Sequence, residues 1–250
     1  MDIQKLYRKL KHEGRVHDHP EYGHELSDSM VLRIHAMLHR CLKDAEAAHV
    51  IARNPTDGAV VPKANHRPKQ ILTKEQMDIF LAAVDRSEIW RDFFYTELTT
   101  GLRRGEICGL KWEDFDEADG TLKVRRTVHQ EKGGKLTTWD TKTAAGTRTI
   151  ILPPSTAELL RERKKSALTE WIFPNPLKPE QPTRPETAYD RMKALLKEAG
   201  LPSIRFHDLR HTFATHALTS GVDVKTLSGI LGHTRSAFTL DTYTHTTGDM

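Results

Sequence analysis

The sequence lacks the features that mark secreted, metal-stapled or membrane-embedded proteins. Its two cysteines, Cys41 and Cys108, lie far apart in stretches that favour helices, and neither belongs to a CxxC pair. This argues against a disulfide framework or a zinc ribbon and favours a reducing compartment. No apolar run approaches the roughly 20 residues that span a bilayer. The N-terminal stretch MDIQKLYRKLKHEGR is polar and charged, unlike a signal peptide. We therefore expect a soluble, cytoplasmic protein without a membrane partner.

Metal-site patterns are also missing, although the chain has 14 histidines. His207 and His211 are four residues apart, but Asp208 stands where the HExxH pattern has glutamate, and no third ligand suggests itself. The N-terminal histidines are spaced unlike a tetrahedral site and are interpreted as a solvated loop. These are His12, His17, His19 and His24.

Acidic residues give no sign of a two-metal nuclease centre. Asp114, Asp116 and Glu117 sit in a predicted turn at the start of a sheet, where we interpret them as loop solvation and capping. We expect neither a metal nor another cofactor, and nothing indicates a small-molecule substrate.

The chain is long and apolar enough to fold. It has 250 residues, of which 37% are hydrophobic and 29% charged, and its formal net charge is +4. Length permits one large domain or two smaller ones. A modest basic excess fits a nucleic-acid partner, although many proteins without such a partner share it.

The apolar periodicity divides the chain into two units joined by a basic linker. Residues 1–62 form a first helical unit, whose clearest helix is predicted over 28–53, with Ser27 or Ser29 as its cap and Asn54–Pro55 as its end. Residues 63–72 form the linker, which has the composition to cross a phosphate backbone. Three of its basic residues are candidate DNA contacts: Lys63, Arg67 and Lys69.

Residues 73–250 form a second, mainly α-helical unit with a small three-stranded antiparallel β-sheet. Thr73–Gln76 is a capping box, and a second box is predicted at Ser155–Glu158. Between them the composition turns to Thr, Val and Ile with alternating polarity, which predicts strands. The strands are expected within 121–128, 135–143 and 146–153, and late helices near 207–220 and 223–231 and around Tyr243.

Four separated segments carry side chains suited to phosphoryl transfer. In TTGLRRGE a glycine break places Arg103 at a helix start, where free amides already favour an anion, and Glu106 one turn on can hold the guanidinium. Lys142 lies at a predicted hairpin tip, where a lysine can reach a DNA groove and donate a proton. Taken singly, each also fits an ordinary surface residue.

The other two segments lie near the C-terminus. His207 and Arg210 are three residues apart and share one helix face, so both can donate to one phosphate. His233 follows a glycine, and Tyr243 comes ten residues later. A phenol is a poor nucleophile unless its surroundings activate it, because its pKa is near 10.

The ordered set TGLRRGE, TKT before a Thr-Ile strand, HDLRHTFATHAL, LGHT and DTYTH resembles the tyrosine recombinase, or phage integrase, family. The likeness runs from about Asp2 to Tyr243, and it is nearest to integrases of phages and conjugative transposons. It implies a catalytic domain over 73–250, preceded by a partial helical core-binding domain. It also implies a site-specific recombinase that acts on double-stranded DNA as a homotetramer, associated with the nucleoid of a bacterial or phage-infected cell.

By position in these motifs, each candidate acquires a role. Tyr243 corresponds to the nucleophile, which forms a 3′-phosphotyrosyl link without metal or ATP. The groups implied to stabilise charge or move protons are Arg103, Lys142, His207, Arg210 and His233, with Glu106 in support. Arg104 is a further candidate DNA contact.

Two features depart from the family pattern. The first unit begins inside what resembles the second helix of the core-binding domain, and only seven residues follow Tyr243. A truncated or non-catalytic relative that binds DNA selectively is therefore the alternative. A type IB topoisomerase, a telomere resolvase and a metal-dependent hydrolase are more remote interpretations.

Overall fold

A computed structural model describes residues 2–20, 22–63, 70–86, 88–131, 133–140 and 147–232. The chain separates into two compact units, Met1–Pro68 and Lys69–Met250. The division falls within the linker expected over 63–72. Among the described residues, no helix is both long and apolar enough to cross a membrane.

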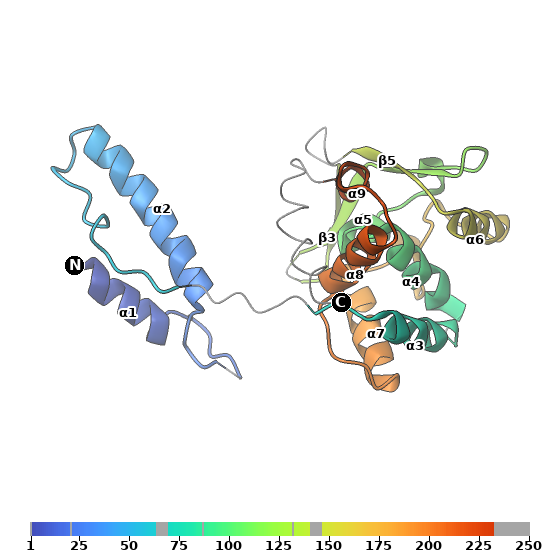
Figure 1. Cartoon of the computed structure of the whole chain (residues 1–250), viewed down its shortest axis with the longest axis horizontal. Coiled ribbons are helices and arrows are strands. Elements are labelled where there is room, and N and C mark those ends of the chain that lie inside the picture. Colours follow the sequence, from blue (N-terminus) through green and yellow to red (C-terminus); the bar gives the residue numbers. More distant parts are fainter. Residues whose placement is uncertain are drawn as a thin grey trace. The chain divides into compact units, whose positions relative to one another are not determined.

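The first unit is built on two helices, α1 (Ile3–Glu13) and α2 (Asp28–Ala47), which lie against each other (Figure 1). Ser27 caps α2, as one of the two expected caps, because its hydroxyl accepts from the amide of Met30 at 3.3 Å. Tyr7 of α1 is buried and its hydroxyl lies 2.8 Å from Nδ1 of His35 on α2. This partly buried polar contact joins the two helices.

Helix α2 ends at Ala47, six residues before the predicted end at residue 53. His49 adopts a left-handed backbone conformation (φ 57°), which no α-helix can continue. Asn54 does not end the helix but folds back onto it, since its side chain donates to the carbonyl of His39 at 3.2 Å.

The second unit has helices where the sequence predicted them near 207–220 and 223–231. The capping box at Thr73 is confirmed by two reciprocal bonds, from Thr73 N to Gln76 Oε1 (3.0 Å) and from Gln76 N to Thr73 Oγ1 (3.2 Å). The box predicted at Ser155 is wrong, because Pro154 starts that helix and its fixed φ suits the first helical position. The helices are α3 (Lys74–Asp85), α4 (Glu88–Thr100), α5 (Arg104–Cys108), α6 (Pro154–Lys165), α7 (Pro185–Glu198), α8 (Phe206–Thr219) and α9 (Val224–Leu231).

The strands pair differently from the expectation, although a three-stranded antiparallel sheet is present. It contains β1 (Phe115–Asp116), β2 (Thr121–Val124) and β5 (Arg148–Ile151), in that order. β3 (Arg126–Gln130) and β4 (Leu136–Asp140) form a separate hairpin, and β6 (Pro174–Asn175) and β7 (Lys178–Pro182) form another that the sequence did not suggest. The predicted strand 121–128 is therefore two strands.

The break between β2 and β3 has a local cause. Arg125 and Arg126 both bind the carboxylate of Asp114, Arg125 through Nε at 2.8 Å. Successive side chains of a strand point to opposite faces, so two neighbours cannot reach one acceptor from a continuous strand. Asp114 also accepts from the amide of Lys111, which is a capping contact, but it is only 4% exposed. Our interpretation of Asp114 as a solvated loop residue is thus wrong.

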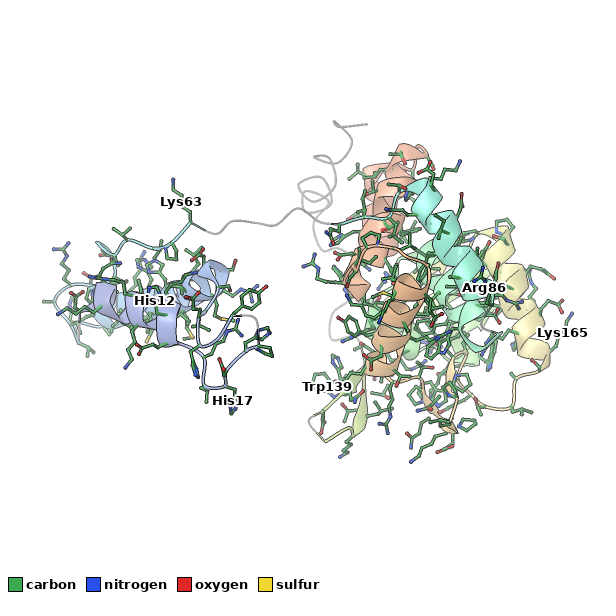
Figure 2. The ribbon with its side chains drawn as sticks, turned by 90° about the horizontal axis from the view of Figure 1, so that it is seen from below. His12, His17, Lys63, Arg86, Trp139 and Lys165 are labelled. Atoms are coloured by element: carbon green, nitrogen blue, oxygen red, sulfur yellow. The ribbon has the colours of Figure 1, made fainter. Side chains whose placement is uncertain are left out.

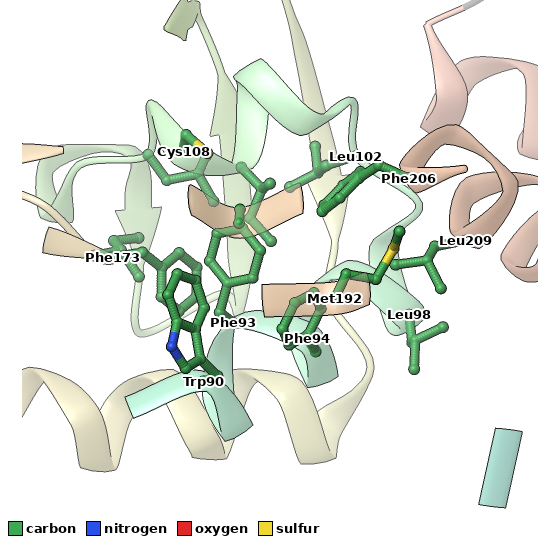
Figure 3. Packing of buried hydrophobic residues seen from close by; sticks show 14 of the residues in the cluster. Trp90, Phe93, Phe94, Leu98, Leu102, Cys108, Phe173, Met192, Phe206 and Leu209 are labelled. Atoms are coloured by element: carbon green, nitrogen blue, oxygen red, sulfur yellow. The ribbon is translucent and has the colours of Figure 1, made fainter. Parts of the chain in front are cut away.

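An aromatic cluster forms the centre of the second unit (Figure 3). Phe93 of α4 meets Phe94 and Phe173 edge to face, each with ring centroids 5.2 Å apart, and it also contacts Trp90 and Phe206. Edge-to-face pairs add to the stability that burial of the rings provides. The cluster ties α4 to the start of α8, which carries two of the predicted site residues.

One carboxyl group lies inside this interior. Glu97 of α4 is fully buried, and among the described residues neither of its oxygens has a hydrogen-bond partner. Burial raises the pKa of Glu97 well above its ordinary value, and the nearby charge of Arg210 counteracts this only partly. The folded protein therefore keeps Glu97 protonated to a higher pH than an exposed glutamate.

Truncation of the central ring is expected to destabilise the second unit strongly. Phe93→Ala should lower the free energy of unfolding by about 3–5 kcal/mol, because it removes a fully packed aromatic side chain and leaves a cavity. Leu168→Ala is the control, since Leu168 is 96% exposed. Urea denaturation measures both, and a loss for Phe93→Ala no larger than for Leu168→Ala would contradict the packing described.

Replacement of Glu97 by glutamine should stabilise the protein, and increasingly so at higher pH. In the unfolded chain Glu97 ionises above its ordinary pKa of 4.5, whereas in the fold it stays protonated, so folding costs about 1.4 kcal/mol more for each pH unit between the two pKa values. Denaturation of wild type and Glu97→Gln across this range measures the difference. Parallel stability curves would show that Glu97 is ionised in the fold.

Candidate active site

The first predicted segment forms a tight turn between α4 and α5. Gly101 ends α4 with φ 59°, and a Cβ there would lie 2.3 Å from the ring of Phe213, so only glycine fits. Arg103 is the N-cap of α5, as its position after the glycine predicted. Glu106 accepts from the backbone amide of Arg103 at 2.9 Å and from its Nη1 at 2.7 Å.

The third predicted segment lies in the first turns of α8. Arg210 is 1% exposed, and its guanidinium donates from Nη1 to the carbonyl of Gly101 (2.8 Å) and from Nη2 to the carbonyl of Leu231 (2.5 Å). These bonds connect three places distant in sequence: the end of α4, the start of α8 and the end of α9. The buried charge is thereby hydrogen-bonded, as buried charges require.

The structure brings Arg103, His207 and Arg210 into one site. Burial lowers the pKa of His207, and the positive charges of Arg210 and Arg103 lower it further. Arg103 and Arg210 both donate to the last carbonyls of α9, and His207 lies three residues before Arg210 on α8. His207 is therefore neutral at pH 7, with one ring nitrogen able to accept a proton and the other able to donate a hydrogen bond.

The carboxyl end of α9 faces these arginines. Gly232 closes the helix in the left-handed conformation (φ 65°), which leaves the last carbonyls without helical partners. Arg103 Nη2 donates to the carbonyl of Gly232 at 3.4 Å, next to the bond from Arg210 to Leu231. Helix α9 lies against both α8 and β5 (Figure 1).

Arg148 is part of the site but was missed in the sequence. Its Nη2 donates to Glu106 at 2.8 Å, on the carboxylate that also binds Arg103, and its side chain is 7% exposed. The alternation of β5 was the available signal. Arg148 is two residues before the buried Ile150 and therefore points to the same inner face, where a charge needs a partner.

Glu106 is strongly stabilised in its ionised form. Burial by itself raises the pKa of Glu106, but the hydrogen bonds and charges of Arg148 and Arg103 outweigh it and lower the pKa to about 2. The carboxylate is therefore charged at every pH at which the protein would be used.

Several predicted residues lie outside the described part of the chain. These are Arg67, Lys69, Lys142, His233 and Tyr243. Lys63 is exposed and points away from the first unit (Figure 2).

Arg104 lies close to the site. Its guanidinium carbon is 5.9 Å from the ring centroid of Tyr189, and both residues line a surface pocket with Arg205 and His207. Across the described residues, no three His, Cys, Asp or Glu side chains are grouped so that they could hold a metal ion. The roles assigned to all these residues remain predictions.

Comparison with known sequences identifies the family. Residues 70–249 match the model of the phage integrase family. The chain is 27% identical to a XerC-like tyrosine recombinase of Caldanaerobacter subterraneus over 98% of its own length and 66% of that protein. It is 32% identical to the tyrosine recombinase XerA of Pyrococcus furiosus, over 78% of the chain and 61% of that protein. The chain thus spans about two thirds of the length of these relatives.

Solved structures share the fold. The Tn1549 transposon integrase in complex with a circular intermediate DNA superposes with a TM-score of 0.80 at 23% identity, over 97% of this chain and 79% of that one. A lambda integrase dimer bound to a core site gives 0.62 at 23% identity, over 86% of this chain and 59% of that one. Together these matches confirm the predicted fold class, and the chain belongs to the phage integrase family.

Proposed function

We propose that the chain acts as a site-specific DNA recombinase that cleaves and rejoins double-stranded DNA through a covalent link to Tyr243. The convergence of Arg103, His207 and Arg210 at the carboxyl end of α9 carries the proposal. These residues come from segments more than 100 positions apart, yet their charges act on one imidazole. Phosphodiester chemistry explains why a fold would assemble such a group.

The two arginines serve the transition state in different ways. Arg103 is 43% exposed, so its guanidinium can contact non-bridging phosphate oxygens while Glu106 fixes its orientation. Arg210 is buried, and its charge acts through the interior, where charges are less screened than in water. Stabilisation of developing negative charge is commonly the largest catalytic contribution.

The proposed reaction exchanges one phosphodiester for another. The phenol oxygen of Tyr243 attacks phosphorus, a new P–O bond forms, and the bond to the 5′ oxygen breaks. Neutral His207 accepts the phenolic proton, and Lys142 protonates the departing 5′ oxygen. His233 adds a hydrogen bond to the phosphate. Because the phosphotyrosine keeps the bond energy, a 5′ hydroxyl can reverse the step without ATP or metal.

The proposed partners are double-stranded DNA and further copies of the chain. Related structures are integrases bound to DNA, among them a lambda integrase tetramer on a Holliday junction. By analogy we propose a tetramer on DNA, at the nucleoid of a bacterial or phage-infected cell. The candidate contacts to the DNA backbone should weaken steeply with salt. They are Lys63, Arg67, Lys69 and Arg104.

A trapping experiment tests the proposal. Duplexes that the protein binds are selected from a random pool, nicked beside each candidate cleavage position, and incubated with protein in EDTA. We expect a covalent protein–DNA adduct with wild type and with Tyr189→Phe, but none with Tyr243→Phe. Tyr189 is the matched control because it lies in the pocket next to His207. Arg103→Ala should lower the rate of adduct formation by about 10²–10³-fold.

Other outcomes would reject the proposal. Selective DNA binding without any adduct would identify a non-catalytic binding protein. Cleavage that requires added metal would identify a hydrolase. An adduct that persists in Tyr243→Phe would place the nucleophile elsewhere.

A further inference from the structure

We infer that Arg148 is a positioning residue of the recombinase site, which holds Glu106 and the end of α9 so that Arg103 faces the phosphate. This inference rests on the proposed function. Only 7% of the Arg148 side chain is exposed, so its contribution acts through its contacts.

The hydrogen bonds of Arg148 connect two parts of the site. Its Nη1 and Nη2 donate to the two carboxylate oxygens of Glu106 at 3.1 and 2.8 Å, a bidentate pair that fixes the carboxylate plane. Its Nε donates to the carbonyl of Ile230 at 2.6 Å. One side chain on β5 therefore orients both α5 and α9.

Glu106 transmits this orientation to Arg103. With its plane fixed by Arg148, the same carboxylate accepts from Nη1 and the backbone amide of Arg103. Without Arg148, one buried carboxylate would face Arg103 alone. Burial would then raise the pKa of Glu106 with less opposition, and a protonated Glu106 would hold Arg103 only weakly.

Arg148 also holds the end of α9, together with Arg210 and Arg103. Three successive carbonyls, of Ile230, Leu231 and Gly232, accept from Arg148, Arg210 and Arg103 in that order. The partial negative charge of a helix C-terminus adds to the attraction of each guanidinium. These three hydrogen bonds fix the end of α9, and His233 is the next residue in the sequence.

Arg163 provides a matched control in the same domain. Its Nε donates to the carbonyl of Ile172 at 2.8 Å and its Nη1 to Asp92 at 2.9 Å, the same combination of one carbonyl and one carboxylate. None of these partners belongs to the candidate site. Arg163 is partly buried, with 22% of its side chain exposed. Its loss should therefore show the cost of losing a hydrogen-bonded arginine without the effect on Arg103.

The first measurement does not depend on cleavage. Carbon-13 NMR follows the side-chain carboxyl of Glu106 with pH in the full chain, assigned by its absence in Glu106→Gln. In wild type and Arg163→Gln we expect Glu106 to stay ionised down to about pH 3, whereas in Arg148→Gln it should titrate above that. Ionised Glu106 at low pH in Arg148→Gln would overturn the inference. Should that variant fail to fold, Arg148→Lys replaces it and should show a smaller rise.

The second measurement uses single-turnover formation of the adduct on the nicked duplex. Arg148→Gln should lower the rate at least about tenfold while DNA affinity changes little, and the loss should deepen as pH falls and Glu106 protonates. Combined with Glu106→Gln, it should cause no further loss, because both act through one carboxylate. Arg163→Gln should cleave at the wild-type rate.

The two proposals fail in different ways. If wild type forms no adduct, the recombinase proposal fails, and the titration of Glu106 alone decides the role of Arg148. If wild type forms an adduct and Arg148→Gln forms it equally fast, the positioning role is rejected while the recombinase proposal stands.

Discussion

The architecture of the site depends on one carboxylate shared by two arginines. Glu106 is 3% exposed, and it binds Arg103 from its own turn and Arg148 from β5. Buried charges are costly unless each is paired and hydrogen-bonded, and here every oxygen of the acid has a cationic donor. Removal of either arginine would leave the buried carboxylate with a single cationic partner. The shared carboxylate thus links α5, which follows Arg103, to β5, which carries Arg148.

Near Glu106, backbone carbonyls accept hydrogen bonds from the guanidinium groups of the site. Arg210 donates hydrogen bonds to the carbonyls of Gly101 and Leu231. Glu97 lies nearby, and burial raises its pKa, which disfavours a negative charge there. Two of the three arginines are therefore not neutralised by Glu106. This arrangement accords with the phosphodiester chemistry proposed for the chain.

The sequence predicted most of what local rules determine. The capping box at Thr73 and the helix start at Arg103 follow from short-range hydrogen bonds, and both were found. The division of the predicted strand at Arg125 was not, because it depends on Asp114, which lies eleven residues earlier and is buried only in the folded unit. Arg148 was missed for a similar reason: its partners lie on α5 and α9, and no local motif refers to them.

Gly101 shows that the site also depends on the conformation of the backbone. Its carbonyl is an acceptor for Arg210, its φ of 59° suits glycine, and a Cβ would collide with Phe213. Any side chain at this position would rotate the peptide and withdraw the acceptor from the guanidinium. In a saturation mutagenesis survey, substitutions at Gly101 should consequently reduce activity as much as substitutions of the site's side chains, although glycine has no side chain to take part in the reaction.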